Sequence, residues 1–193
     1  MIRKTFFTGI LITVMASGIS AQGKKSALLL IDIQDFYFPG GRSELVAPVP
    51  AAEKAALLLV RFRQKGLTVV HVRHNSEPGG NINSIVSPAS GEKIFSKSEV
   101  NCFKGTGLDE YLRSCGIDTL IICGMQTHMC VEAAVRAGTD LGYRCILVHD
   151  ACATKDLKFG DRVIRSEDVH YSTLSTLRSY ATVESAEEYL SRK

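Results

Sequence analysis

Cys130 is the residue of this chain whose sequence setting most favours chemistry. It lies where an apolar, β-branched run over residues 119–123 gives way to a helical pattern after residue 130. A thiol at such a strand-to-helix turn lies near unpaired backbone amides and the positive end of the helix dipole, which favour the nucleophilic thiolate. The layout parallels the serine turn of other hydrolases, although the GxSxG letters are absent. A small buried side chain is the alternative, and this segment alone leaves both interpretations open.

Two charged residues could serve such a cysteine. Asp32 is the acidic residue embedded in the first apolar run, residues 27–33, and a buried carboxylate needs a cationic or hydrogen-bonding partner. Lys97 lies in a long segment, residues 74–106, that is rich in Gly, Asn, Ser and Pro. Loops of this length in a compact domain tend to be functional. A base, a cation and amide donors around a thiol are what a cysteine hydrolase requires.

Strand and helix patterns alternate along the chain, which predicts how these residues are positioned. Strands are expected near residues 27–33, 68–73, 119–123, 143–149 and 182–184, and helices near 51–65, 108–115, after Cys130, near 160–180 and after Ser185. This order predicts an α/β fold of three layers, with a mainly parallel five- or six-stranded sheet covered by helices on both faces. The ligand crevice of such a sheet lies beyond the carboxyl ends of its strands. Asp32, the His74 region and the Cys130 turn all fall there.

Five motifs, in order, resemble the isochorismatase-like cysteine hydrolase superfamily, which includes nicotinamidase-related amidohydrolases. They are residues 29–36 with 39–41, residues 72–74, residues 97–103, residues 124–131, and residues 150–154 with 142–143. Together they extend over nearly the whole chain after residue 21. The resemblance implies that superfamily's Rossmann-like fold. It also implies a hydrolase that cleaves a small amide or related C–N bond through a thioester.

The resemblance further implies a catalytic triad of Asp32, Lys97 and Cys130. Asp32 would accept the thiol proton and later deliver it to the leaving group, while Lys97 would keep Asp32 ionised. A cis peptide bond is implied between Met125 and Gln126. The backbone amides of Gln126 and Cys130 would then form the oxyanion hole.

Four side chains are candidates for the substrate pocket: Phe36, His74, Phe103 and His128. For Phe36 and His74 a pocket role and a packing role are equally open, and His128 is also a candidate oligomer contact. His170 shares a helical pattern with Leu174 and Leu177, which favours packing over catalysis.

Departures from the resembled family narrow the chemistry. Nicotinamidases bind a metal through histidines that have no counterpart between Asp35 and Lys65, so no metal and no cofactor are expected. Isochorismatase proper lacks the nucleophilic cysteine, so its vinyl-ether chemistry is a poor match. Asn101 and Cys102 stand where the family often has Ser-Ala, which leaves that pocket wall open.

The first 21 residues have the order of a secretory signal peptide. Arg3 and Lys4 precede an apolar run over residues 6–15, and small residues follow up to Ala21. The apolar run is too short for a comfortable membrane span. We therefore predict cleavage after Ala21, export to the periplasm or the medium, and a single hydrolase domain over residues 22–193.

Charge and composition indicate which partners to expect. The leader carries two basic and no acidic residues, so the rest of the chain has 21 basic against 20 acidic residues, a net charge of +1. The sequence has no basic stripe, no zinc-like Cys/His spacing and no phosphate-cradling glycine loop. We therefore expect neither a nucleic-acid partner nor membrane association after cleavage. The expected partners are a small-molecule amide substrate and further copies of the chain in a homo-oligomer.

Two other functions stay open at this stage. One is a non-catalytic binding or assembly protein on the same fold, and the other is a thiol redox protein. Besides Cys130, the chain has five cysteines whose disulfide pairing cannot be assigned from sequence: Cys102, Cys115, Cys123, Cys145 and Cys152. The absence of a CxxC pair counts against redox chemistry.

Overall fold

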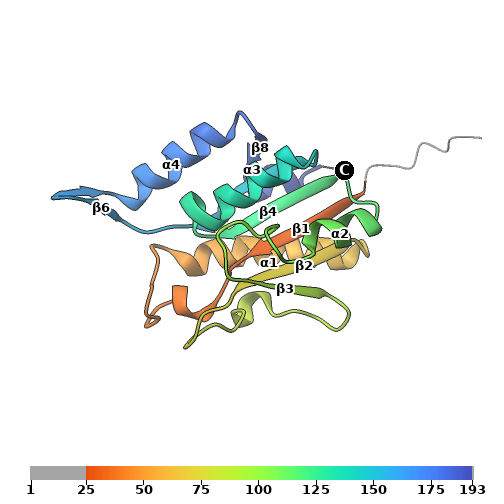
Figure 1. Ribbon diagram of the computed structural model, residues 1–193, viewed down its shortest axis with the longest axis horizontal. Coiled ribbons are helices and arrows are strands. Elements are labelled where there is room, and N and C mark those ends of the chain that lie inside the picture. Colours follow the sequence, from red (N-terminus) through yellow and green to blue (C-terminus); the bar gives the residue numbers. More distant parts are fainter. Residues whose placement is uncertain (1–24, 193) are drawn as a thin grey trace, which may run out of the picture.

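The computed structural model describes residues 25–192, in which six parallel strands form one sheet. The predicted signal peptide, residues 1–21, lies outside the described residues. The strand order is β3-β2-β1-β4-β5-β8, and Figure 1 shows this sheet between its helices. The strands are β1 (Ser26–Ile31), β2 (Thr68–His74), β3 (Lys93–Lys97), β4 (Thr119–Met125), β5 (Arg144–Ala153) and β8 (Ala181–Glu184). The predicted α/β fold, with a mainly parallel sheet of five or six strands, is confirmed.

The central strands are continuous apolar runs because helices cover both faces of the sheet. Every residue of β4 is buried. Ile121 and Ile146 face the helix α1 (Pro48–Gln64), where both line a cavity with Phe62. Leu120 and Cys145 face the opposite side, where they lie against Gly138 of α3 (Glu132–Asp140).

The remaining helices complete these two layers. The short helix α5 (Ala186–Leu190) packs beside α1, and α4 (Ser166–Leu177) packs beside α3. Helix α2 (Leu108–Ser114) lies near the end of α3, since Arg113 donates a hydrogen bond to the backbone oxygen of Leu141 at 2.9 Å. Three short turns are also present: η1 (Asp35–Tyr37), η2 (Ser84–Val86) and the π-type turn η3 (Thr127–Val131).

The predicted helix over residues 160–180 is wrong in its first part. A two-stranded antiparallel hairpin, β6 (Leu157–Phe159) and β7 (Arg162–Ile164), precedes α4, which begins at Ser166. Gly160 has a φ of +58°, the left-handed conformation that a tight turn needs and a helix excludes. The apolar residues on either side of this turn therefore belong to paired strands.

The long segment over residues 74–106 is also more ordered than its composition indicates. It contains η2 and the edge strand β3, which pairs with β2. Most β3 residues are exposed or half-buried, so the strand lacks the apolar run by which the inner strands are recognised. Its last residue, Lys97, is the buried one.

All six cysteines are free thiols, and Cys115 is half-buried while the other five are buried. Cys123 and Cys145 belong to the apolar core, as their strand-like surroundings predict. Within residues 25–192, no helix is long and apolar enough to cross a membrane.

Candidate active site

Three side chains from separate strands meet at the carboxyl end of the sheet. Asp32 follows β1, Lys97 ends β3, and Cys130 lies in η3 directly after β4. Lys97 Nζ lies 2.7 Å from Asp32 Oδ2 and donates to Cys130 Sγ at 3.2 Å. The side chains of Asp32 and Lys97 are both fully buried, and Cys130 is 6% exposed. One ammonium group therefore joins a carboxylate to a thiol out of contact with bulk water.

The close approach of β1 to β4 brings Asp32 beside the cysteine turn. Ile31, the last residue of β1, pairs with Gly124. Gly124 has a φ of +132°, and a Cβ at this position would lie 2.0 Å from the backbone oxygen of Ile31. Asp32 itself has a φ of +49°, a left-handed conformation that aspartate tolerates better than most residues. The glycine is thus required by contact as well as by backbone conformation.

Gln34 holds the segment after Asp32 against the end of β2. Its Oε1 accepts from the backbone N–H of His74 at 2.7 Å, and its Nε2 donates to the backbone oxygens of His74 and Gly80. His74 Nδ1 lies 3.3 Å from Lys97 Nζ. Burial and the Lys97 charge lower the pKa of His74, so the neutral imidazole faces the ammonium.

Burial and charge pairing act against each other at Asp32 and Lys97. Burial raises the pKa of Asp32, and Lys97 offsets part of that shift. For Lys97, burial alone would lower the pKa, but the attraction of Asp32 outweighs it and the pKa lies above its usual value. The ammonium is therefore retained, and Asp32 is a stronger base than a solvent-exposed carboxylate.

The cysteine is held as a thiol in the resting site. Burial and the negative charge of Asp32 raise the pKa of Cys130 to about 12, although Lys97 opposes this. The sequence predicts a thiolate favoured by the helix dipole. The structure differs because Cys130 is buried next to a carboxylate. A thiol with so high a pKa can react as a nucleophile when a neighbouring base takes its proton in the same step.

The turn that carries Cys130 begins at Gln126. The peptide bond between Met125 and Gln126 is cis. The backbone oxygen of Gln126 accepts from the N–H groups of Met129 and Val131, and its side-chain Nε2 donates to the Tyr37 hydroxyl at 3.2 Å. The backbone of Gln126 is thus fixed immediately before η3.

Two of the predicted pocket residues, Phe36 and Phe103, lie in different places. Phe36 lies edge to face against Tyr37, with Arg42 stacked 4.9 Å from its ring centre, and both Phe36 and Arg42 line an open cavity of about 420 Å³. Phe103 instead stacks against Tyr143, which directly precedes β5. Since Cys130 lies at the carboxyl end of the strands, Phe103 is directed to the opposite end of the sheet.

Two histidine–threonine pairs hold η3, the turn that carries Cys130, from outside. His170 Nδ1 lies 2.9 Å from the hydroxyl of the fully buried Thr127, and His128 Nδ1 lies 2.6 Å from that of Thr154. The sequence favours a packing role for His170 and gives neither threonine a role of its own within its motif. The helical spacing of His170 carried no signal for a partner 43 residues earlier in the chain.

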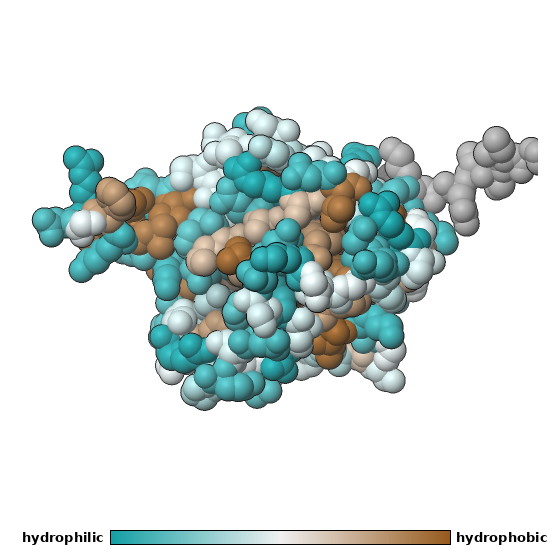
Figure 2. Space-filling view, in the orientation of Figure 1, coloured by the Kyte–Doolittle hydropathy of each residue, from teal (hydrophilic) through white to brown (hydrophobic). Residues whose placement is uncertain are grey.

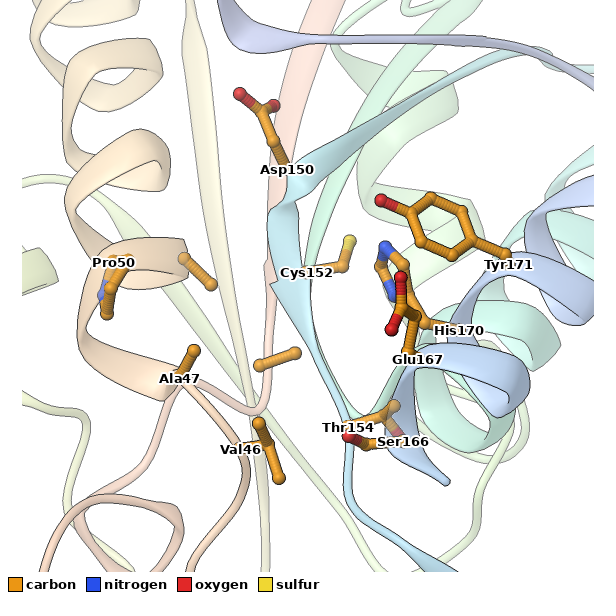
Figure 3. Close-up of a pocket in the computed structure, with 12 residues that line it drawn as sticks. Val46, Ala47, Pro50, Asp150, Cys152, Thr154, Ser166, Glu167, His170 and Tyr171 are labelled. Carbon is orange, nitrogen blue, oxygen red and sulfur yellow. The ribbon is translucent and has the colours of Figure 1, made fainter. Parts of the chain in front are cut away.

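A cavity of about 310 Å³ lies next to these pairs, and Figure 3 shows its lining. Val46, Ala47 and Pro50 form one wall, where α1 begins. Residues of β5 and of the first turns of α4, His170 among them, form the rest. The cavity does not include Asp32, Lys97 or Cys130 in its lining.

No group of three or more His, Cys, Asp or Glu side chains in the described part of the chain is arranged to hold a metal ion. His71 and His74, the two histidines of β2, both have polar neighbours. His71 Nε2 lies 2.9 Å from Glu92 Oε2, and His74 Nδ1 faces Lys97.

Comparison with known proteins places this architecture in a family. The isochorismatase domain matches residues 26–188, so the chain belongs to the isochorismatase family. The uncharacterised isochorismatase family protein YddQ of Bacillus subtilis is 40% identical over 177 residues, which cover 86% of this chain and 98% of that protein.

Two relatives have names that state a hydrolytic activity. Maleamate amidohydrolase of Pseudomonas putida is 30% identical over 75% of this chain and 85% of its own length. Streptothricin hydrolase of Streptomyces noursei is 33% identical over 68% of this chain, and the match covers half of that protein. The chain is therefore an isochorismatase-family hydrolase related to amidohydrolases.

Solved structures agree with this assignment. A crystal structure of an isochorismatase-family protein from Oleispira antarctica has a TM-score of 0.86 at 40% identity and covers 90% of this chain and all of that one. An isochorismatase from Pseudomonas putida has a TM-score of 0.81 at 34% identity, covering 84% of this chain and 89% of that one.

Proposed function

We propose that this chain is a metal-independent cysteine amidohydrolase that cleaves a small amide or related C–N bond through a thioester. Cys130 is the nucleophile, Asp32 the base and then the acid, and Lys97 the cation that holds both. The observation that carries the proposal is the single Lys97 ammonium placed 2.7 Å from the carboxylate and 3.2 Å from the thiol.

The first half-reaction forms the thioester. Asp32 takes the proton of Cys130 as the sulfur attacks the carbonyl carbon of the amide, so no free thiolate has to accumulate. The backbone amides of Gln126 and Cys130 bind the oxyanion that results. When the intermediate collapses, the C–N bond breaks and Asp32 returns its proton to the leaving nitrogen, which departs as ammonia or an amine.

The second half-reaction releases the acid. Asp32, now a carboxylate again, takes a proton from a water molecule as the water oxygen attacks the thioester carbon. The C–S bond then breaks, the sulfur regains a proton from Asp32, and the carboxylic acid leaves. The raised pKa of Asp32 suits both directions of proton transfer, and the raised pKa of Lys97 keeps its charge in place throughout.

The relatives support the class of substrate. The name of one states an amidohydrolase acting on maleamate, which is a small amide. The cavity beside Phe36 and Arg42 is open to solvent and of a size that takes small molecules, but Asp32, Lys97 and Cys130 do not line it.

A screen of small amides with ammonia detection tests the proposal. It is paired with alkylation of the native protein, in which loss of activity should follow the labelling of Cys130 one to one. Cys115→Ala is the matched control, because Cys115 is a second, more accessible thiol outside the site. Activity that survives complete alkylation of Cys130 would exclude a cysteine mechanism.

A further inference from the structure

The hairpin of β6 and β7 extends away from the body of the molecule. Figure 1 shows it beyond the end of α4, and Figure 2 shows hydrophobic residues along it. We call residues 155–165 the arm. Leu157 pairs with Ile164 and Phe159 pairs with Arg162, so these four side chains share one face of the hairpin.

The apolar part of that face is open to solvent. Phe159 is 81% exposed, the highest value among the large apolar side chains of residues 25–192, and Ile164 on the same face is 39% exposed. The two strands pack chiefly against each other. A two-stranded hairpin alone is marginally stable in water, so a partner that covers this face would stabilise it.

The base of the arm is nevertheless fixed. Asp156 Oδ2 forms an ion pair with Arg165 at 2.9 Å, and Asp156 Oδ1 accepts from the backbone N–H of Ser166 at 2.8 Å. These bonds join both strands to the first residue of α4. The arm is therefore presented in a defined direction, which lowers the entropy that docking would cost.

The cavity of Figure 3 has an apolar wall and an acidic side chain, which complement the apolar and basic side chains of the arm. Its wall of Val46, Ala47 and Pro50 is apolar, and Tyr171 opposite is 58% exposed. Glu167 lies on its edge and has no ion-pair partner within residues 25–192. The arm carries two exposed cations, Lys158 before Phe159 in sequence and Arg162 paired with it across the hairpin. Neither has an ion-pair partner within residues 25–192.

We propose that the arm docks into this cavity on a second copy of the chain, and that the second copy returns the same contact. Phe159 would lie against the apolar wall of the cavity, and Arg162 would approach Glu167. Much of the rest of the lining is polar and includes Asp150, Thr154, Ser166 and His170. Since one chain carries both the arm and its complement, a two-fold axis satisfies both contacts and closes the assembly as a dimer.

The docking site adjoins the nucleophile turn. Thr154 and His170 line the cavity and hydrogen-bond to His128 and Thr127, the residues two and three positions before Cys130. Association through the arm does not depend on the proposed amidase activity.

Sedimentation velocity over a concentration series, on the full purified protein, tests the proposal. The parent should sediment as a dimer, and Phe159→Asp should raise the dissociation constant about tenfold or more. Ile94→Asp is the matched control, because Ile94 is a 50% exposed apolar residue on the edge strand β3. It should leave the dimer intact.

Charge reversal adds a test that does not depend on the apolar contact. Arg162→Glu and Glu167→Arg should each weaken the dimer, and the double variant should recover much of the loss. Both residues are exposed, so the fold should survive all three variants.

Two results would overturn the proposal: the parent could sediment as a monomer throughout, or Phe159→Asp could stay dimeric. In the second case, dissociation of the dimer by Leu57→Asp would place the interface on the exposed face of α1 instead.

Discussion

Asp32 and Lys97 are charged side chains with no exposure to solvent, and each depends on the other. Removing one member of a buried pair leaves an uncompensated charge and costs about 3–5 kcal/mol. Asp32 has the further property that its pKa is raised in the folded protein by burial, against the opposing effect of Lys97. The stability of the site should therefore depend on pH once Lys97 is removed.

We expect Lys97→Met to be less stable than the parent, and more so as pH rises. The variant loses the charge that opposes the shift, so the folded-state pKa of Asp32 moves further above the unfolded value. The contribution of Asp32 to stability is then fully present below its pKa in the unfolded chain. It is lost as pH rises through its pKa in the folded protein. Urea unfolding over a pH series measures this.

Lys93→Met provides the comparison, because Lys93 is an exposed residue at the other end of the same strand. Its unfolding free energy should differ from that of the parent by a small, constant amount. A Lys97→Met deficit that is equal at acidic and alkaline pH would contradict the proposed charge coupling.

Activity should survive exhaustive chelation. His71 is bonded to Glu92 and His74 faces Lys97, so neither is free to begin a metal site in the conformation described. The measurement is ammonia release after dialysis against a strong chelator with metal removal verified. Activity that is lost and then restored by zinc, iron or manganese would show a metal requirement.

The sequence identifies the three charged and thiol side chains of the site but not the direction of every neighbouring side chain. Asp32, Lys97 and Cys130 could be named because each occupies a motif and an unusual chemical setting. Phe103 belongs to the same 97–103 motif as Lys97, yet it stacks on Tyr143 at the far end of the sheet. The direction of a loop side chain depends on tertiary packing, which local sequence does not encode.

At the scale of elements, the site depends on how closely the ends of β1 and β4 approach. Gly124→Ala should destabilise the protein by more than about 4 kcal/mol and abolish activity. A Cβ 2.0 Å from the Ile31 oxygen would force apart the strand ends that carry Asp32 and the Cys130 turn.

Gly142→Ala tests the effect of a positive φ without a steric contact like that of Gly124 with Ile31. Gly142 also has a positive φ, +90°, but a Cβ there meets nothing within 4 Å. It should cost about 1–3 kcal/mol and leave activity near normal. Similar urea midpoints for the two variants would show that the contact with Ile31 is unimportant.

The elements that could be predicted are those with strong periodicity or distinct ends. The inner strands and α1 follow from apolar patterns, and the Ser185 cap is present as a full capping box with Glu188. The sequence does not predict the hairpin of β6 and β7, because its apolar residues directly precede α4 and resemble a continuation of that helix. The edge strand β3 was missed because it is too exposed to show an apolar run.

At the scale of the whole molecule, the parallel sheet converts distant sequence positions into neighbours. Asp32, Lys97 and Cys130 are separated by 33 residues or more, yet they meet because three strands end at one edge. Fold class predicts this meeting for Asp32 and Cys130, whose strands have apolar patterns. The place of Lys97 in the triad came from the family resemblance, because the exposed strand β3 carries no such pattern.

We also propose that the molecule is exported, on the basis of its N-terminal pattern. The protein recovered from the periplasm or the medium should begin at Gln22, and substituting Arg3 and Lys4 by acidic residues should retain it in the cytoplasm. Intact mass measurement of each fraction is the test. A full-length protein confined to the cytoplasm would contradict export.

The most direct test of the central claim is the turnover of Cys130→Ala on the best amide found by screening. The account predicts loss of ammonia release by several orders of magnitude, about the size seen when a hydrolase nucleophile is removed. The thermal unfolding midpoint should stay close to that of the parent, because the substitution removes one sulfur from a small buried side chain. Near-normal turnover by this variant would contradict the assignment of Cys130 as the nucleophile.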